Sequence, residues 1–355
     1  MEAYAIIMAG GNGERFWPMS TPERPKQFLG LFGGKPLIRH AVDRLAGLIP
    51  AERIFVITSD RFIAQTHAAL PMLPIENIVG EPCRRDTAAA VATACGLVLR
   101  RGGPESVGCI LTADQLIGPV PAFQQTLADA IAVAGRTDSI VTMGIAPTRP
   151  DTGFGYIETG DVAATDTKTP FRSVVRFVEK PDEAAAVRYL SSGRFLWNSG
   201  MFVWKAATMR DAFHAHALDI AALLEAVAAS SDVKATLDRL YPDLRAISVD
   251  FAVMEHAADI LVAESRFSWD DVGSWAAVEH HFPQDESGNT VIGRTAVLDS
   301  RSSIVVNTSA ADHVVAVSGL KDIVVVHTAK ATLVCHKDAL KGLKTLVAAA
   351  RDRES

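Results

Sequence analysis

Short apolar runs alternate with amphipathic stretches through the first 143 residues of the chain. The runs have the length and composition of buried parallel strands, and they lie at 4–9, 53–58, 75–79, 107–112 and 139–143. Between them, apolar positions at helical spacing predict helices at 36–48, 61–70, 86–100 and 121–134. Asp86 is a candidate N-cap of the third helix. Strands that alternate with helices in this way predict a Rossmann-like, doubly wound α/β sheet.

The pattern changes beyond residue 150. Alternating apolar and polar positions at 153–158 and 171–181 predict antiparallel strands, so the sheet is expected to be mixed. Further predicted elements are strands at 197–204 and 260–263, helices at 182–191, within 206–241 and at 249–256, and a helix opened by 269–275. From residue 288, five short β-branched runs predict a small stacked or coiled β domain, followed by a terminal helix at 339–351. We therefore expect two domains, 1–284 and 285–355.

A glycine-rich turn follows the first predicted strand directly. Gly10, Gly11 and Gly13 permit positive φ and let a ligand approach the main-chain N–H groups. Three cations come after the turn, namely Arg15, Arg24 and Lys26. The spacing matches neither the dinucleotide fingerprint nor the Walker pattern. Main-chain donors followed by cations indicate a polyphosphate site, although a simple tight turn is the competing interpretation.

Other candidate residues have an ordinary structural interpretation beside a functional one. Asp114 and Asp271 each end an apolar run, where an aspartate is commonly a turn residue; both also carry the hard oxygen ligands that Mg²⁺ prefers. Whether two residues so distant in sequence meet stays open. Lys180 fits either a solvated strand end or a cation for a second phosphate, and Asn198 fits either a bend or a sugar contact.

Composition and charge narrow the cellular setting. A net charge of −6 argues against a nucleic-acid partner, because no broad excess of cations exists to neutralise a phosphate backbone. The four cysteines show no paired spacing, which favours a reducing compartment. No apolar window is long enough for a membrane span, and the first apolar run is too short for a signal peptide. We expect a cytoplasmic protein without a membrane partner.

Seven segments together resemble one enzyme family. They are M-A-G-G-N-G-E-R-F-W-P-M-S at 8–20, P-K-Q-F-L at 25–29, G-E-P-C-R-R-D-T-A-A-A at 80–90, F-G-Y-I-E at 154–158, F-V-E-K-P at 177–181, W-N-S-G-M-F at 197–202 and W-D-D-V-G-S-W at 269–275. Their sequence and order resemble those of the bacterial mannose-1-phosphate guanylyltransferases (GDP-mannose pyrophosphorylases), among the sugar-1-phosphate nucleotidylyltransferases. The resemblance covers nearly the whole chain.

The resemblance implies Mg²⁺-assisted transfer of GMP from GTP to α-D-mannose 1-phosphate, by in-line attack on the α-phosphorus. It also implies a nucleotidyltransferase catalytic domain at 1–284 and a left-handed β-helix-like domain at 285–355. The implied nucleotide-binding residues are Gly10, Gly11, Gly13, Arg15, Lys26, Glu81, Arg85, Asp86, Thr87 and Asp114, with Glu81 suggested for guanine. Gly155, Glu179, Lys180 and Asn198 are implied for the sugar phosphate, and Asp114 and Asp271 for the metal. Arg15, Lys26 and Lys180 are the implied catalytic cations.

Two departures from the family pattern and two rival functions accompany this interpretation. Gln115 stands where many relatives have histidine, and Asp86 stands where asparagine is frequent. The rivals are a nucleotidylyltransferase for another sugar 1-phosphate and nucleotide, and a catalytically silent regulatory homologue. Retention of both aspartates and of the phosphate cations speaks against the silent homologue. The β-rich tail either forms a homodimer interface or caps the catalytic domain.

Overall fold

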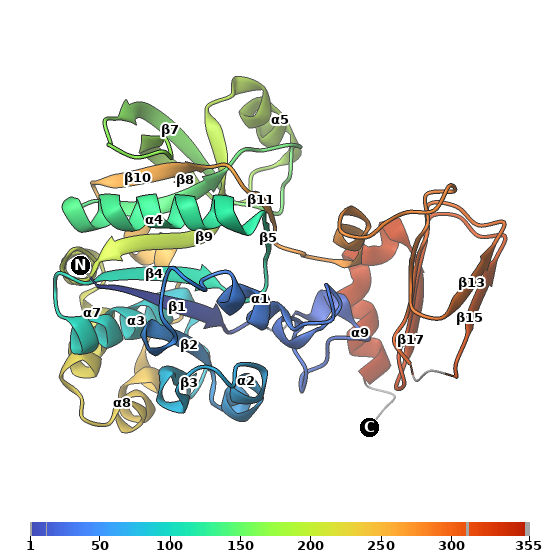
Figure 1. Cartoon of the computed structure of the whole chain (residues 1–355), viewed down its shortest axis with the longest axis horizontal. Helices are drawn as coiled ribbons and strands as arrows, with labels where there is room; N and C mark the ends of the chain where they lie inside the picture. Colours follow the sequence, from blue (N-terminus) through green and yellow to red (C-terminus); the bar gives the residue numbers. More distant parts are fainter. Residues whose placement is uncertain (1, 12, 310–311, 352–355) are drawn as a thin grey trace. The chain divides into compact units, whose positions relative to one another are not determined.

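The computed structural model describes residues 2–11, 13–309 and 312–351. Two units account for the chain (Figure 1). The first comprises Met1–Gly10, Ile38–Ala113 and Ile117–Trp269, and the second comprises Gly11–Leu37, Asp114–Leu116 and Asp270–Ser355. A two-stranded ribbon of β5 (Leu116–Gly118) and β11 (Ser268–Asp270) contains two of the five positions where the chain passes from one unit to the other.

A nine-stranded mixed sheet organises the first unit, in the order β3-β2-β1-β4-β9-β6-β10-β8-β7. Its strands are β1 (Ala3–Ala9), β2 (Ile54–Ser59), β3 (Ile78–Glu81), β4 (Val107–Thr112), β6 (Ile140–Ile145), β7 (Tyr156–Ala163), β8 (Phe171–Val178), β9 (Phe195–Lys205) and β10 (Ile260–Ser265). The first four strands pair in parallel, as does β10 with β6, whereas β7, β8 and β9 pair with their neighbours antiparallel. The predicted mixed, doubly wound sheet is confirmed.

Helices pack on both faces of this sheet. They are α1 (Leu37–Asp43), α2 (Ile63–Ala69), α3 (Asp86–Gly102), α4 (Val120–Arg136), α5 (Glu183–Ser192), α6 (Ala206–His216), α7 (Leu218–Ala229) and α8 (Val233–Leu240). The alanine-rich α3 packs tightly with α6 and α7 over Tyr4 and Ile6 of β1 in one large apolar core. On the other face α4 contacts β4, β6, β9 and β10 (Figure 1). Small alanine side chains permit this close helix packing.

Several predicted boundaries differ from the structure. Residues 75–77 form a short 3₁₀ turn, and the strand begins only at Ile78. Arg85 rather than Asp86 occupies the N-cap of α3, and no side chain caps that helix; the N-cap prediction is wrong. Residues 268–270 belong to β11, so the helix predicted to open at 269 starts at Trp275 as the 3₁₀ helix η8 (Trp275–His280).

Stacked short strands form the β domain of the second unit. Strands β12 (Thr290–Ile292), β14 (Ile304–Asn307) and β16 (Ile323–His327) pair in parallel, and β17 (Thr332–His336) closes the sheet antiparallel. Strands β13 (Thr295–Leu298) and β15 (Val315–Ser318) form a second, parallel pair. The 3₁₀ helix η9 (Lys337–Gly342) and α9 (Leu343–Arg351) follow. The predicted β-helix-like domain and terminal helix are confirmed.

Strands β14 and β16 of this domain are buried on both faces, which explains their continuous apolar sequences. In β16, Val324 and Val326 join a core with α9, whereas Val325 faces a second small core with Val317. The first of these cores also contains aromatic residues of the N-terminal loop, among them Phe16. The second unit therefore combines segments from three parts of the chain, whereas the sequence analysis divides the chain once near residue 285. That domain boundary stays a prediction.

Candidate functional site

The ammonium group of Lys26 joins two aspartates of the second unit. Its Nζ lies 3.0 Å from Oδ2 of Asp114, and it also donates a hydrogen bond to the backbone carbonyl oxygen of Asp271. Lys26 opens the 3₁₀ helix η2 (Lys26–Phe28), and the two aspartates follow β4 and β11 closely. The Lys26 side chain is 8% exposed and that of Asp114 is 39% exposed. Three predicted site residues, far apart in sequence, thus form one cluster.

Gly13 fixes the position of the lysine stem. Its φ is +58°, and a Cβ atom added there would lie only 2.1 Å from Cβ of Lys26. The Ser20 hydroxyl donates to the Gly13 carbonyl oxygen over 2.6 Å, which holds the turn closed. By contrast, a Cβ atom on Gly11 would meet nothing within 4 Å. Of these two glycines, only Gly13 is required by both its φ and its packing.

A buried tryptophan connects the glycine loop to the segment that carries Asp271. The ring of Trp275 lies 5.1 Å from that of Phe16, and its indole N–H donates to the Trp17 carbonyl oxygen over 2.9 Å. Both rings are almost fully buried. The two family-like segments at 8–20 and 269–275 are therefore parts of one packed structure, which limits the movement of the catalytic candidates they carry.

Burial and the neighbouring charged groups shift the pKa of the Asp271 carboxyl in opposite directions. Burial raises the pKa of its carboxyl above the ordinary value, and the nearby Lys26 ammonium opposes that rise. The carboxylates of Asp270 and Asp114 raise the pKa further, whereas the Arg15 guanidinium lowers it. Carboxylates that raise one another's pKa, beside a buried ammonium group, form a polar site that an additional cation would stabilise.

The donor set suits a cation that takes most of its ligands from a substrate. Within residues 2–11, 13–309 and 312–351, no group of three or more His, Cys, Asp or Glu side chains could hold a metal ion. The Lys26 cluster contributes two carboxylates, from Asp114 and Asp271. Mg²⁺ is typically held by one or two carboxylates together with substrate phosphates and water. The residues therefore fit a divalent cation that shares its ligands with a bound substrate better than a permanent metal centre.

A second group of candidates surrounds Glu81 in the first unit. The Tyr241 hydroxyl donates to Oε1 of Glu81. A Cβ atom on Gly10 would lie 3.5 Å from Oε2, so the other carboxylate oxygen sits beside the end of β1. Burial raises the pKa of Glu81, while the Tyr241 hydrogen bond and the Arg84 charge lower it. Tyr241, 160 residues away, carries no motif signal and was missed by the sequence analysis.

The three predicted nucleoside residues at the start of α3 already have protein partners. The guanidinium of Arg85 donates to the carbonyl oxygens of Arg84 and Pro242. The Asp86 carboxylate accepts from the N–H of Thr87, whose hydroxyl accepts from the backbone N–H of Val249. These contacts attach the beginning of α3 to the segment around residues 242–249. A role in binding nucleoside stays a prediction for all three.

The predicted sugar-phosphate residues lie together in the first unit. The N–H of Asn198 donates to the Gly155 carbonyl oxygen over 2.8 Å. A Cβ atom on Gly155 would lie 3.3 Å from Oε2 of Glu179, so a larger residue would crowd that carboxylate. Lys180 Nζ lies 2.8 Å from Oε1 of Glu179, and its side chain is largely exposed. The φ of Lys180 is +28°, a strained value of the kind that clusters at functional sites.

Asp250 belongs to this second cluster although the sequence analysis overlooked it. It begins a π-helical turn, η7 (Asp250–Met254), and its Oδ1 accepts a hydrogen bond from Asn198 Nδ2 over 3.2 Å. Burial raises the pKa of Asp250, the Asn198 hydrogen bond lowers it, and the Glu179 charge raises it. Single π-helical turns are frequent at functional sites. The predicted short helix at 249–256 was the only sequence signal here, and it carries no chemistry.

The predicted site residues are thus divided between the units. Gly11, Gly13, Arg15, Lys26, Asp114 and Asp271 belong to the second unit. Gly10 and the candidates for nucleoside and sugar phosphate belong to the first. Gln115, one of the two departures from the family pattern, is buried.

Comparison with known proteins places the chain in a class and then in a family. A family model for nucleotidyl transferases matches residues 4–288, and one for the MannoseP isomerase/GMP-like β-helix domain matches residues 293–349. The first match contains the nine-stranded mixed sheet, and the second contains most of the β domain and its terminal helix. Nucleotidyltransferases generally use a divalent metal ion.

Individual relatives narrow the class. The mannose-1-phosphate guanylyltransferase of Klebsiella pneumoniae is 37% identical over 351 residues, which cover 96% of this chain and 72% of that protein. The alginate biosynthesis protein AlgA of Pseudomonas putida is 34% identical over 347 residues, covering 96% and 70%. A crystal structure from Thermus thermophilus, described as a mannose-1-phosphate geranyltransferase, is 35% identical with a TM-score of 0.87 and covers 99% of this chain and 100% of that one. The chain belongs to the mannose-1-phosphate guanylyltransferase family.

Proposed function

We propose that the protein transfers GMP from GTP to α-D-mannose 1-phosphate, forming GDP-mannose and releasing pyrophosphate. Family membership supports the reaction. The observation that carries the site assignment is the Lys26 cluster, in which a buried ammonium group contacts the side chain of Asp114 and the backbone of Asp271. Nucleotidyl transfer needs positioning and charge neutralisation more than covalent help from the protein.

In the proposed step, an oxygen of the sugar phosphate attacks the α-phosphorus of GTP in line. A new oxygen–phosphorus bond forms while the bond from the α-phosphorus to the bridging oxygen breaks, so the electron pair leaves with pyrophosphate. The attacking oxygen is already anionic, so no general base is required. Lys26 and Arg15 neutralise charge on the triphosphate, and Lys180 holds the incoming phosphate.

Asp114 and Asp271 are the proposed ligands of a magnesium ion. When bound, the ion would add positive charge at the phosphates of the nucleotide. In the free protein, the Lys26 ammonium supplies the counter-charge for Asp114. Asp271 must lose its proton to act as a ligand, and its raised pKa makes that loss harder than for an ordinary aspartate.

Specificity is assigned to the two clusters of the first unit. We propose that Glu81 accepts hydrogen bonds from the N1–H and N2–H₂ groups of guanine, with Tyr241 orienting its carboxylate. Hydroxyl groups of mannose would bond to Asn198 and Asp250, which are hydrogen-bonded to each other, and to Glu179, which lies beside Gly155. We also propose that the nucleoside lies beside the start of α3, where it would neighbour Arg85, Asp86 and Thr87.

The proposed setting is the cytoplasm. No helix within the described parts of the chain has the length and hydropathy needed to cross a membrane. All four cysteines are free, in keeping with the expected reducing compartment. A homodimer formed through the β domain is proposed as the assembly. Sizing of the full chain in solution tests it: a dimer should elute at twice the mass of one chain, and a monomer at every concentration would contradict the proposal.

A pyrophosphate-release assay on a matrix of nucleoside triphosphates and sugar 1-phosphates tests the reaction itself. We expect the highest kcat/KM for GTP with mannose 1-phosphate. A preference for another pair would replace the substrate assignment and keep nucleotidyl transfer. Absence of pyrophosphate release with every pair would favour the silent regulatory homologue.

A further inference from the structure

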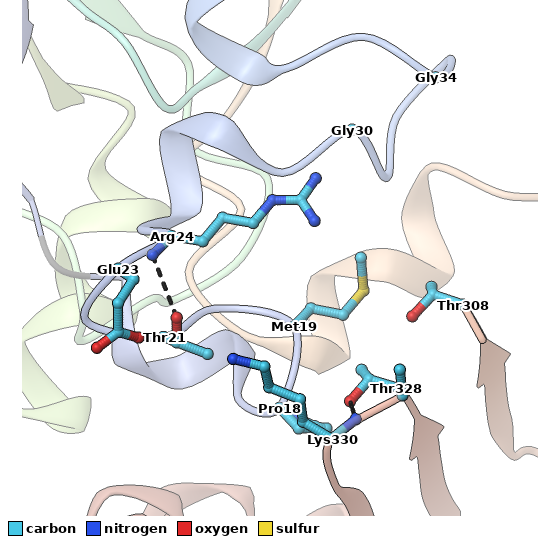
Figure 2. Close-up of a pocket in the computed structure, with 11 residues that line it drawn as sticks. Pro18, Met19, Thr21, Glu23, Arg24, Gly30, Gly34, Thr308, Thr328 and Lys330 are labelled. Carbon is cyan, nitrogen blue, oxygen red and sulfur yellow. Dashed lines mark hydrogen bonds between the residues drawn. The ribbon is translucent and has the colours of Figure 1, made fainter. Parts of the chain in front are cut away.

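A cavity of about 590 Å³ lies within the second unit (Figure 2). One wall is the loop that follows the glycine turn, and the other is formed by turns of the β domain. The lining residues are Pro18, Met19, Thr21, Glu23, Arg24, Gly30, Gly34, Thr308, Thr328, Ala329 and Lys330. They include neither Lys26 nor the two aspartates beside it. The volume is in the range of small-molecule sites.

Two cations reach this cavity from its opposite walls. Arg24 comes from the loop and Lys330 from the β domain, and in Figure 2 their side chains are extended and point in different directions. Over the described parts of the chain, neither of them forms an ion pair. Glu23 is the one carboxylate among the eleven lining residues, and in Figure 2 its side chain runs away from the Arg24 guanidinium. Positive charge at the cavity is therefore incompletely balanced, which favours an anion.

The remaining polar side chains add one donor and few acceptors. The hydroxyl oxygen of Thr21 accepts a hydrogen bond from the backbone N–H of Arg24 over 3.2 Å, so the hydroxyl proton is available to a ligand. The hydroxyls of Thr308 and Thr328 already donate to backbone carbonyl oxygens. Pro18 and Met19 supply an apolar surface beside the cations. Charged donors beside an apolar wall suit a phosphate group attached to an organic body.

We propose that this cavity binds a phosphate monoester of a small organic molecule, with Arg24 and Lys330 holding the phosphate. The sequence analysis grouped Arg24 with Arg15 and Lys26 as cations of one polyphosphate site. The lining of the cavity separates it from them and places it with Lys330, more than 300 residues away. None of the residues that line this second site is assigned a step in the transfer reaction proposed above.

Occupancy of the cavity acts on the segment that carries Lys26. Thr21 and Arg24 exchange two backbone hydrogen bonds of 3.1 and 3.0 Å, and Pro25 connects this turn directly to Lys26. The N–H of Leu29 then donates to the Lys26 carbonyl oxygen over 2.9 Å. A ligand that immobilises the Arg24 side chain therefore restrains residues 21–29. Their amide hydrogens should exchange more slowly when ligand is bound.

Isothermal titration of the full chain with glucose 6-phosphate and with inorganic phosphate, at matched ionic strength, tests the proposal. We expect one site per chain that prefers the ester, because only the ester reaches Pro18 and Met19. Lys330→Gln should weaken binding of the ester about tenfold or more, since it removes a charged hydrogen-bond donor. Equal affinity for free phosphate would overturn the assignment to an ester. Hydrogen exchange should show protection of 21–29 and 328–330 in the wild type.

Matched variants locate the binding. Lys341→Gln removes an exposed lysine that does not line the cavity, and it should bind the ester like the wild type. Lys330→Gln should leave pyrophosphate release unchanged, because Lys330 is not part of the catalytic cluster. A variant carrying both Lys26→Ala and Lys180→Ala should still bind the ester. Loss of binding in that double variant, or unchanged binding in Lys330→Gln, would overturn the proposal.

Discussion

Lys26 Nζ lies 3.0 Å from Oδ2 of Asp114, a residue 88 positions further along the chain. The lysine side chain is nearly buried, so its charge needs a partner in the free protein, and Asp114 provides it. A bound triphosphate would offer the ammonium group a different anionic partner. The pair thus keeps a phosphate-binding cation charged and oriented before the substrate arrives.

Replacement of Lys26 by methionine keeps most of the buried stem and removes the charge. We expect kcat to fall by about 10²–10³, the usual loss when one stabilising donor is removed from a charged transition state. Pyrophosphate release at saturating substrates measures it. Lys341→Met is the control, because that lysine is exposed. Near-wild-type turnover of Lys26→Met would remove this residue from the mechanism.

Asp271→Asn should separate stability from activity. Burial raises the pKa of Asp271 in the folded protein above its unfolded value, so the folded state holds the proton to higher pH. The stability contributed by this group is therefore present at low pH and decreases as pH rises from the unfolded to the folded pKa. Asparagine does not ionise, so the variant does not lose this stability as pH rises. We therefore expect a higher melting temperature at neutral pH, together with much lower activity.

Melting curves of wild type and Asp271→Asn across acidic to neutral pH provide the measurement. The difference in melting temperature should grow as pH rises through the titration of Asp271. Asp270→Asn is a useful comparison, since Asp270 accepts hydrogen bonds from the Val272 N–H and from His281. That variant should lose stability. A destabilised Asp271→Asn protein would show that the ionised carboxylate contributes favourably to folding.

Gly13→Ala and Gly11→Ala form a matched pair in one loop. Alanine at position 13 would need φ of +58° and would meet Cβ of Lys26 at 2.1 Å. We expect a loss of about 1–3 kcal/mol in unfolding free energy from backbone strain, together with lower kcat as Lys26 is displaced. Gly11→Ala meets no atom within 4 Å and should retain stability. Denaturant titration distinguishes the two, and equal stability would contradict the packing argument.

Tyr241→Phe should weaken discrimination between GTP and ITP, which lacks the 2-amino group. Loss of the hydroxyl leaves Glu81 without its buried donor, and we expect the ratio of kcat/KM values to fall about tenfold. Glu81→Gln should reduce the ratio at least as much. Tyr189→Phe is the control, since the Tyr189 ring stacks on Phe195 in a different part of the first unit. An unchanged ratio in Tyr241→Phe would reduce Tyr241 to a packing residue.

Asp250→Asn tests the sugar cluster. The amide that replaces the carboxylate turns either its oxygen or its NH₂ group toward Asn198 Nδ2. The oxygen is a weaker acceptor than the carboxylate, and the NH₂ group is a second donor. We expect KM for mannose 1-phosphate to rise about tenfold, from the loss of a charged hydrogen bond, with KM for GTP unchanged. Glu255→Gln, at an exposed position just after the same π-helical turn, is the control. A rise in both KM values would indicate general damage rather than sugar recognition.

Much of the fold follows from local pattern. The run at 107–112 is recognisable as β4 because a strand buried on both faces needs continuous apolar residues. The same reasoning identifies β14 and β16 in the β domain. Helix boundaries were less predictable: α3 runs on to Gly102, and no side chain caps its start. Such boundaries depend on contacts with the rest of the chain.

The sequence by itself determined the strands, the glycine turn and the family, because these features depend on residues adjacent in the chain. Only the tertiary structure decided which distant side chains meet. It brought Asp114 and Asp271 to one lysine, paired Tyr241 with Glu81 and Asp250 with Asn198, and assigned Arg24 to a different cavity from Lys26. The physical reason is that a hydrogen bond acts over about 3 Å. Which distant residues come that close depends on the order of the strands in the sheet and on the paths of the connecting segments, not on the residues adjacent in the chain.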